Sequence, residues 1–322
     1  MKINQNKTSN STISRLLLFG LTLAICGSVS LRVVAQQFDS PAIQTFPVGH
    51  FPVALTFDGA NVWAANSDSD TVTKLRASDG VHLGTFAVGA NPLGAAFDGA
   101  NVWVVNDNDG TVSKLRASDG TLLGTFSVGY GPRDIVFDGA NIWVCNLGNN
   151  SVTKLRASDG VVLGTFSANV PSGITFDGRS IWVTNFTDST VTKMRASDGV
   201  VENVIPVGLN PSGVTFDGRN IWVSNSGYSI PGNTVTKILA RDATVEGPFK
   251  VDRGPAAITS DGKHIWVCTR QHNTVTELRE NGTKVTTYDV PNKPSAILFD
   301  GTSIWVADDL SNVVTKISRP AR

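Results

Sequence analysis

Four short apolar runs, separated by polar turns, recur along most of this chain. One copy consists of Asn91–Phe97, Val102–Asn106, Thr111–Arg116 and Leu122–Val128, and these runs are rich in Val, Thr, Phe and Leu. Asp-Gly or Asn/Asp-rich turns separate the runs, and Asp-Gly between β-type runs is a strong hairpin signal because Gly adopts positive φ without steric cost. No segment after residue 35 has the 3.6-residue period of an amphipathic helix. The pattern predicts a four-stranded antiparallel meander, whose strands we call A to D in chain order.

Each copy has one tryptophan, in its strand B. The spacings between successive tryptophans are 40, 40, 39, 40, 44 and 39 residues, and a period near forty is typical of stacked or ring-shaped repeats. Most of these tryptophans are preceded by Ile or Val and followed by Val. Strand B is therefore apolar on both faces and should be covered by a neighbouring sheet on each side. Sheets packed radially around an axis meet this requirement, which predicts a β-propeller. The seven residues are Trp63, Trp103, Trp143, Trp182, Trp222, Trp266 and Trp305.

The ends of the chain predict how the ring closes. After Trp305 the chain reaches a strand C, Val313–Ser318, and has no strand D after it, whereas Ile43–Gly49 matches the strand D pattern of Gly84–Gly89. The N-terminal strand should therefore complete the last blade and leave no open edge. We predict an all-β, seven-bladed β-propeller of four-stranded antiparallel blades, formed as a single domain by residues 36–322.

Residues 1–35 have the pattern of a signal peptide. Basic residues precede an apolar run, Leu16–Ser30, and Val33 and Ala35 place small residues at the −3 and −1 positions of a cleavage site. The alternative is a retained membrane helix, but the run of about 15 residues is shorter than the ~20 that a bilayer requires. We expect a secreted or periplasmic protein with no membrane span after cleavage. Cleavage leaves 23 basic and 27 acidic residues, a net charge of −4, so no nucleic acid is expected as a partner.

Strand C has a lysine at one register in six copies and an arginine two residues later in four. A functional basic ring is one interpretation. The other, which we favour, is that the stems lie over apolar surface while the charged heads pair with carboxylates of the turns.

The two ends of the blades differ in how far the copies agree. The A–B and C–D turns repeat Phe-Asp-Gly and Ala-Ser-Asp-Gly, whereas the B–C loops and D–A crossings vary from copy to copy. Binding residues concentrate on variable loops held by a rigid scaffold, although drift in solvated loops would produce the same variation. The candidate ligand-binding residues are Tyr130, Arg133, Asp134, Tyr228, Arg270, His272, Asp308 and Asp309.

The residue three after each tryptophan is a second candidate feature. It is Asn in five copies, Thr269 in the sixth and Asp308 in the seventh. If these side chains surround the central channel together, their oxygens would suit water, Ca²⁺ or another polar ligand. Alternatively, each Asn satisfies backbone groups of its own blade. No cofactor is predicted; Ca²⁺ or Mg²⁺ would have Asp308, Asn66 and Asn106 as candidate ligands.

The repeat Ile181–Asn185, followed by Thr190–Met194, resembles the Tyr-Val-Thr-Asn repeat of YVTN-type seven-bladed propellers over residues 38–322. It is also similar to NHL-repeat and virginiamycin B lyase-like propellers. That resemblance implies a Trp-Phe-Thr-Glu blade motif whose carboxylates assist Mg²⁺-dependent elimination. Here the Glu position holds Asn, Thr269 or Asp308, which disfavours lyase activity.

These observations predict a monomeric binding or interaction module with no catalysis evident. Its partner would be a protein, a glycan or a small polar ligand, bound on the B–C and D–A loops. The alternative is a metal-assisted lyase or lactonase-like hydrolase at the channel mouth, with His272 as acid or base. No nucleophile elbow, Cys-x-x-Cys pair or glycine-rich phosphate loop is present.

Overall fold

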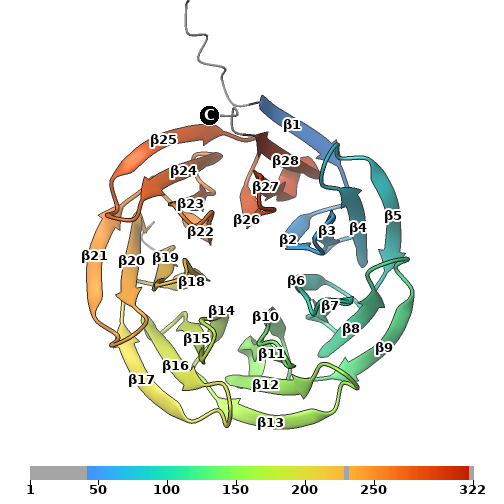
Figure 1. Cartoon of the computed structure of the whole chain (residues 1–322), viewed down its shortest axis with the longest axis horizontal. Helices are drawn as coiled ribbons and strands as arrows, with labels where there is room; N and C mark the ends of the chain where they lie inside the picture. Colours follow the sequence, from blue (N-terminus) through green and yellow to red (C-terminus); the bar gives the residue numbers. More distant parts are fainter. Residues whose placement is uncertain (1–41, 228–231, 319–322) are drawn as a thin grey trace, which may run out of the picture. The chain divides into compact units, whose positions relative to one another are not determined.

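The computed structural model describes residues 42–227 and 232–318. In this part the chain forms seven four-stranded antiparallel sheets, which surround a central axis as blades (Figure 1). The predicted seven-bladed β-propeller is confirmed. The predicted signal segment, residues 1–35, lies outside the described residues, as does the expected domain start at residue 36.

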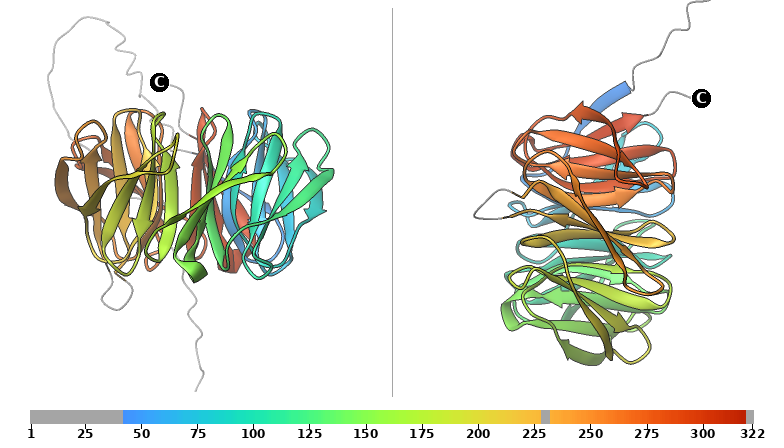
Figure 2. Two further views of the ribbon diagram at one scale, coloured as in Figure 1. Left: turned by 90° about the horizontal axis from the view of Figure 1, so that it is seen from below. Right: turned by 90° about the vertical axis from the view of Figure 1, so that its left-hand side faces the viewer.

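Strand A of each blade lies nearest the axis and strand D lies outermost (Figure 1). Seen from the edge, the strands run between two faces that bear the loops (Figure 2). Blade 1 consists of β2 (Pro52–Phe57), β3 (Asn61–Asn66), β4 (Thr71–Arg76) and β5 (His82–Ala87), blade 2 of β6 (Pro92–Phe97), β7 (Asn101–Asn106), β8 (Thr111–Arg116) and β9 (Leu122–Ser127), and blade 3 of β10 (Pro132–Phe137), β11 (Asn141–Asn146), η1 (Leu147–Asn149), β12 (Ser151–Arg156) and β13 (Val162–Ser167). Blade 4 consists of β14 (Pro171–Phe176), β15 (Ser180–Asn185), β16 (Thr190–Arg195) and β17 (Val201–Pro206), and blade 5 of β18 (Pro211–Phe216), β19 (Asn220–Asn225), β20 (Thr234–Leu239) and β21 (Val245–Lys250). Blade 6 consists of β22 (Pro255–Ser260), β23 (His264–Thr269), β24 (Thr274–Arg279) and β25 (Lys284–Asp289), and blade 7 of β26 (Pro294–Phe299), β27 (Ser303–Asp308), η2 (Asp309–Ser311), β28 (Val313–Ser318) and β1 (Ala42–Pro47).

Blade 7 is completed by the N-terminal strand, as predicted. Strand β1 pairs with β28 in antiparallel register, from Ala42 opposite Ser318 to Pro47 opposite Val313. The sheet order β1-β28-β27-β26 therefore joins the two ends of the described chain in one blade.

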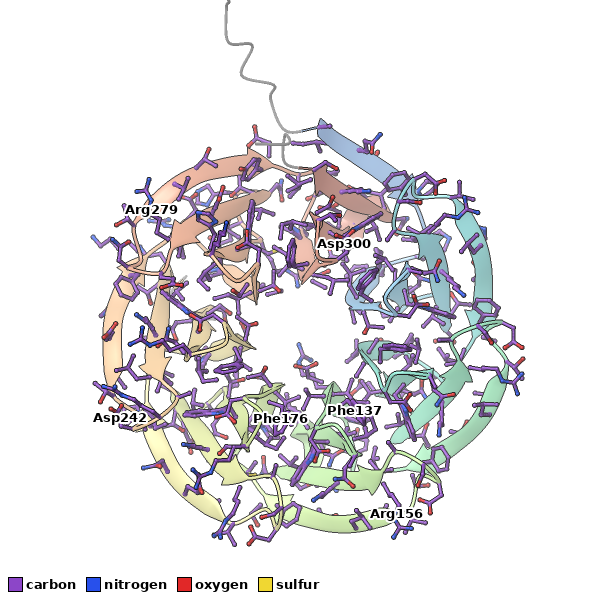
Figure 3. The ribbon with its side chains drawn as sticks, viewed as in Figure 1. Phe137, Arg156, Phe176, Asp242, Arg279 and Asp300 are labelled. Atoms are coloured by element: carbon purple, nitrogen blue, oxygen red, sulfur yellow. The ribbon has the colours of Figure 1, made fainter. Side chains whose placement is uncertain are left out.

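The tryptophans fill the spaces between blades, and each has a polar partner that the sequence analysis did not anticipate. Trp103 is fully buried and packs with Ile142 and Val144 of the next blade. Its Nε1 donates to Asp98 Oδ2 at 2.7 Å, while Asp98 Oδ1 accepts from the backbone N–H of Asn101. A buried indole N–H needs such an acceptor, so the Asp of the A–B turn both forms the turn and fixes the tryptophan. The seven acceptors are Asp58, Asp98, Asp138, Asp177, Asp217, Asp261 and Asp300, the last of which is labelled in Figure 3.

The expected pairing of the strand C lysines with turn carboxylates is not what the structure shows. Lys114 Nζ lies 4.9 Å from the centroid of the Trp103 ring and donates to Ala157 O at 2.7 Å, in the C–D turn of the next blade. The corresponding lysines of blades 1, 3, 4 and 7 also donate to such carbonyls. Only Lys193 and Lys237 also lie near a carboxylate, Glu202 or Glu246 of strand D, among the described residues. In blades 1, 2, 3, 4 and 7 the lysine head is thus a clamp between two blades.

The arginines two residues further on do pair with turn carboxylates. Arg156, on the outer part of the ring in Figure 3, contacts Asp159 at 2.8 Å. Both side chains are about half exposed, which leaves such a pair well solvated.

Blade 6 has Glu277 at the position of the clamp lysine. The next blade, blade 7, has no C–D turn, because its strands C and D are β28 and β1 from opposite ends of the chain. A lysine there would lack the carbonyl acceptors that the C–D turns of blades 1 to 5 provide. Glu277 instead accepts from the Tyr288 hydroxyl at 2.9 Å and lies 3.6 Å from His264 Nδ1.

Replacement of Lys114 by Met tests the clamp. The variant retains an apolar stem but leaves the Ala157 and Ser158 carbonyls without the ammonium, so we expect the free energy of unfolding to fall by about 1–3 kcal/mol. Arg116→Met is the matched control on the same strand and should change the urea midpoint little, because its partner Asp119 is exposed. Equal losses in the two variants would show that the lysine head adds nothing to blade packing.

Candidate functional site

The B–C loops and D–A crossings form one face of the ring, which we call the loop face. The five asparagines at the ends of the B strands are buried beneath it. Asn66 Nδ2 donates to Thr71 Oγ1 and Thr73 Oγ1 at 3.2 and 3.0 Å, both on the neighbouring strand of its own blade. The same arrangement recurs at Asn106, Asn146, Asn185 and Asn225.

In blades 2 and 3 the asparagine oxygen binds the D–A crossing that enters the blade. Asn106 Oδ1 accepts from Gly89 N, and Asn146 Oδ1 from Gly129 N, each at 3.1 Å. Of the two amides that were candidates for a shared ring of ligands, Asn106 is therefore engaged through both its nitrogen and its oxygen. Asn66 is engaged through Nδ2 alone, and its Oδ1, like that of Asn185 and Asn225, is buried without a hydrogen-bond partner in the described structure. In the described part of the chain no group of three or more His, Cys, Asp or Glu side chains is placed to hold a metal ion.

In blade 7 three residues depart from this pattern together. Asp308 replaces the asparagine, and Val313 stands at the register position of Thr71. Pro291 occupies the crossing position of Gly89 and has no N–H to donate. Thr315 Oγ1 still donates to Asp308 Oδ2 at 2.5 Å. Asp308 Oδ1 is buried without a hydrogen-bond partner in the described structure, as is Oδ1 of Asn66, Asn185 and Asn225. Asp308 differs from these asparagines in that its buried group is a carboxyl group.

Burial is the main reason that the pKa of Asp308 rises to about 7, and the neighbouring charge of Asp309 adds to it. The Thr315 hydrogen bond acts in the opposite direction and is outweighed. Asp308 is fully buried, so at neutral pH about half of these side chains carry a proton.

Asp309 begins η2 and joins blade 7 to blade 6. Its Oδ2 is paired with the guanidinium of Arg270, which follows β23. Burial raises the pKa of Asp309, although the charge of Arg270 opposes the rise. The structure thus brings together three of the predicted candidates, Arg270, Asp308 and Asp309. His272 lies two residues beyond Arg270 and is exposed in the β23–β24 loop.

A second group of candidates lies in blade 3. Tyr130, in the crossing from β9 to β10, is 71% exposed. Its ring lies against Gly148 of η1, where a Cβ would come within 2.3 Å of Tyr130 Cδ1. The Gly148 N–H donates to Tyr130 O at 3.0 Å. Because residue 148 has no side chain, the tyrosine ring can lie over the backbone of the neighbouring loop.

Beside this ring is a depression of about 230 Å³. Its lining comes entirely from the loop face: the β7–β8 loop, the β9–β10 crossing and η1. The residues are Asp107, Asn108, Tyr130, Gly131, Leu147 and Gly148.

Arg133 and Asp134 follow on β10, the innermost strand of blade 3. Asp134 stands where the other blades have Ala or Gly, and its Oδ2 accepts from Ile174 N of blade 4 at 3.0 Å. Burial raises the pKa of Asp134 to about 6, while its backbone hydrogen bonds and Arg133 oppose the rise. Arg133 is exposed.

The two groups of candidates do not form one cluster. Strand β10 packs against β6 and β14, whereas β26 of blade 7 packs against β22 and β2, and the two strands lie on opposite sides of the axis (Figure 1). The remaining candidate, Tyr228, lies outside the described residues.

Comparison with known proteins supports the fold but no particular family. No protein-family model and no curated protein sequence matches this chain. No helix in the described part combines the length and apolar character that crossing a membrane would require.

Several solved structures are similar at low sequence identity. Hydrazine synthase of Kuenenia stuttgartiensis is 20% identical, with a TM-score of 0.72 over 91% of this chain and 99% of that one. A catalytically inactive virginiamycin B lyase from Staphylococcus aureus, crystallised with quinupristin, is 18% identical, with a TM-score of 0.75 over 87% and 99%. The WD40 repeats of RRP9 are 12% identical, with a TM-score of 0.75 over 87% and 99%. The chain therefore has a seven-bladed propeller fold similar to that of a lyase and of a WD40-repeat domain, and this fold does not by itself select an activity.

Proposed function

We propose that this chain is an exported, monomeric propeller of the YVTN type that acts as a binding module through its loop face. Its ligand is a protein, a glycan or a small polar molecule. The signal-like segment at residues 1–35 supports export, and the repeated Trp-Val-x-Asn supports the YVTN assignment. The mature charge of −4 favours partners other than nucleic acid.

The contrast between the two faces carries this proposal. On the opposite face, which carries the A–B and C–D turns, the repeated Asp residues are bound within their own blades. The A–B Asp accepts from its tryptophan, and the C–D Asp of blades 1 to 4 pairs with its arginine. On the loop face, Tyr130 presents a large, mostly exposed ring, which lies against Gly148 because that residue has no side chain. Aromatic rings of this kind gain most from burial under a ligand and are enriched at interaction hot spots. The depression of about 230 Å³ suits one side chain or one sugar ring of a larger ligand.

Glycan and peptide arrays probed with the chain lacking residues 1–35 would test this proposal. We expect Tyr130→Ala to reduce the signal of the bound ligands by tenfold or more, which corresponds to losing an interaction of about 1.4 kcal/mol or more. Val161→Ala, which changes an apolar side chain that is 49% exposed beside the outer strand β13, is the control and should leave binding unchanged. Binding that depends on Val161 but not on Tyr130 would place the interaction on the outer wall and overturn the proposal.

The second candidate is a metal-assisted lyase or lactonase-like hydrolase. Its specific support is Asp308, a buried acid whose pKa of about 7 suits proton transfer at neutral pH. Asp309 adds a second carboxylate oxygen that is buried without a partner in the described structure. Both side chains are fully buried, however, and in the described part of the chain they belong to no group of three or more His, Cys, Asp or Glu side chains placed to hold a metal ion. The binding function therefore has the stronger structural support.

A further inference from the structure

The Tyr130 depression has the composition of a site for a cation. Tyr130, which is 71% exposed, and Asp107 both line it. Asn91 Nδ2 donates to Asp107 Oδ2 at 3.0 Å, which fixes the orientation of the carboxylate. A Cβ built on Gly131 would lie 3.6 Å from Asp107 Oδ1, in ordinary contact. The oxygen that Asn91 does not bind therefore faces the crossing that carries the tyrosine.

The charges around the depression also favour a positive ligand. The β3–β4 and β7–β8 loops contribute four carboxylates and no lysine or arginine: Asp68, Asp70, Asp107 and Asp109. The basic residues of the loop face gather instead over blade 6 and the entry to blade 7, at Arg253, Arg270 and Lys293. Arg133 lies closer, on β10, but is not among the residues that line the depression.

We propose that this site binds a single ammonium group, a protonated or methylated amine such as a lysine side chain or a choline-like headgroup. The face of an aromatic ring attracts such a cation, and the Asp107 carboxylate neutralises its charge. Leu147 adds an apolar wall for the carbon atoms next to the nitrogen. The inference rests on the proposed binding function and names the chemistry of its ligand.

The chain allows a direct spectroscopic test, because it has only three tyrosines. In protein labelled with 3-fluorotyrosine, the Tyr130 signal is the one that disappears in Tyr130→Phe. Titration with choline should shift this signal, whereas 3,3-dimethylbutan-1-ol, a neutral molecule of the same shape, should not. Asp107→Asn and Gly148→Ala should each weaken choline binding roughly 2- to 30-fold, the range expected for loss of one cation–π or charge contact. Asp68→Asn, which removes the same charge from the neighbouring loop, should weaken it much less.

Two outcomes would overturn the cation assignment. Equal shifts with the two molecules would show that the site selects shape rather than charge. No shift with either, in protein whose array binding still depends on Tyr130, would show that the ligand is neutral. In both cases the proposed binding function of the loop face would stand. If Tyr130→Ala left array binding unchanged, both the binding function and the cation site would be contradicted.

Discussion

A chain without β1 (Ala42–Pro47) is expected to melt at a temperature lower by roughly 10 °C or more. Phe46 of β1 lies 5.6 Å, ring to ring, from Trp305 and packs with residues of blades 7 and 1, including Val62 and Val314. Loss of a packed phenylalanine alone costs about 3–5 kcal/mol, and each kcal/mol is worth about 2 °C in a chain of this size. The deletion also leaves β28 as an unpaired edge, so the variant should aggregate on heating.

Two measurements separate ring closure from simple loss of packing. Phe46→Ala and Phe86→Ala should have similar melting temperatures, because Phe86 covers Trp63 at 5.5 Å in a blade whose four strands are continuous in sequence. Both should be more stable than the chain without β1. A synthetic peptide of residues 42–49, added to the shortened chain, should restore part of the lost stability by pairing with β28. An unchanged melting temperature after deletion would mean that the ring does not depend on its N-terminal strand.

The fold could be predicted from the sequence because its signals are local and repeated. Each blade has its own tryptophan and its own Asp-Gly turn, and copies at a period near forty reinforce one another. Closure was also predictable, since Ile43–Gly49 has the same pattern as Gly84–Gly89. None of these inferences required knowledge of which residues meet across blades.

Contacts across blades are what the sequence did not reveal. The acceptor of Lys114 lies 43 residues away in the next blade, and it is a backbone carbonyl, which no side-chain pattern marks. Blade 6 has Glu277 where six other blades have lysine, and nothing in the sequence explains this difference. The structure explains it, because the adjacent blade 7 has no C–D turn to accept from a lysine.

The candidate site shows the same limit. Asp308 was visible as an exception to the asparagine repeat, but Val313 and Pro291 are exceptions at two other positions of the blade. Only the strand register, which pairs Val313 with Asp308, and the place of Pro291 in the crossing relate all three to one carboxylate. A comparison of the repeats position by position would have identified each of the three exceptions, but not that they belong to one site. In the same way, Gly148 gave no signal that it makes room for the ring of Tyr130.

Asp308→Asn is expected to stabilise the protein at neutral and alkaline pH but not at acidic pH. The pKa of Asp308 is about 7 in the folded chain against an ordinary value of 3.8. Folding therefore favours the protonated form. The wild-type chain has the full benefit of that proton below pH 4 and loses it as the pH rises toward 7. Asparagine carries no charge, and its Nδ2 would donate to Thr315 Oγ1, as Asn66 does to Thr73.

The free energy of unfolding of the variant should exceed that of the wild type by up to about 4 kcal/mol at pH 8, since each pKa unit corresponds to 1.36 kcal/mol. The two proteins should be nearly equal at pH 4. Urea unfolding across this range measures the difference. Asp188→Asn, which removes an exposed carboxylate from blade 4, is the control and should show no such change. The pKa of Asp134 is also raised, to about 6, so the wild type and both variants retain a shared fall in stability near that pH.

The wild type and Asp308→Asn also distinguish the binding function from the metal-assisted enzyme. If Ca²⁺ or Mg²⁺ occupies the unpartnered oxygens of Asp308 and Asp309, then adding the ion at pH 8 should raise the melting temperature of the wild type but not of Asp308→Asn. The metal would then offset the cost of the buried charge, and the advantage of the variant would shrink or reverse. That result would favour the metal-assisted enzyme. If instead the variant remains more stable at every ion concentration, Asp308 is a destabilising departure from the asparagine repeat. Ligand recognition would then rest with Tyr130 on the far side of the ring.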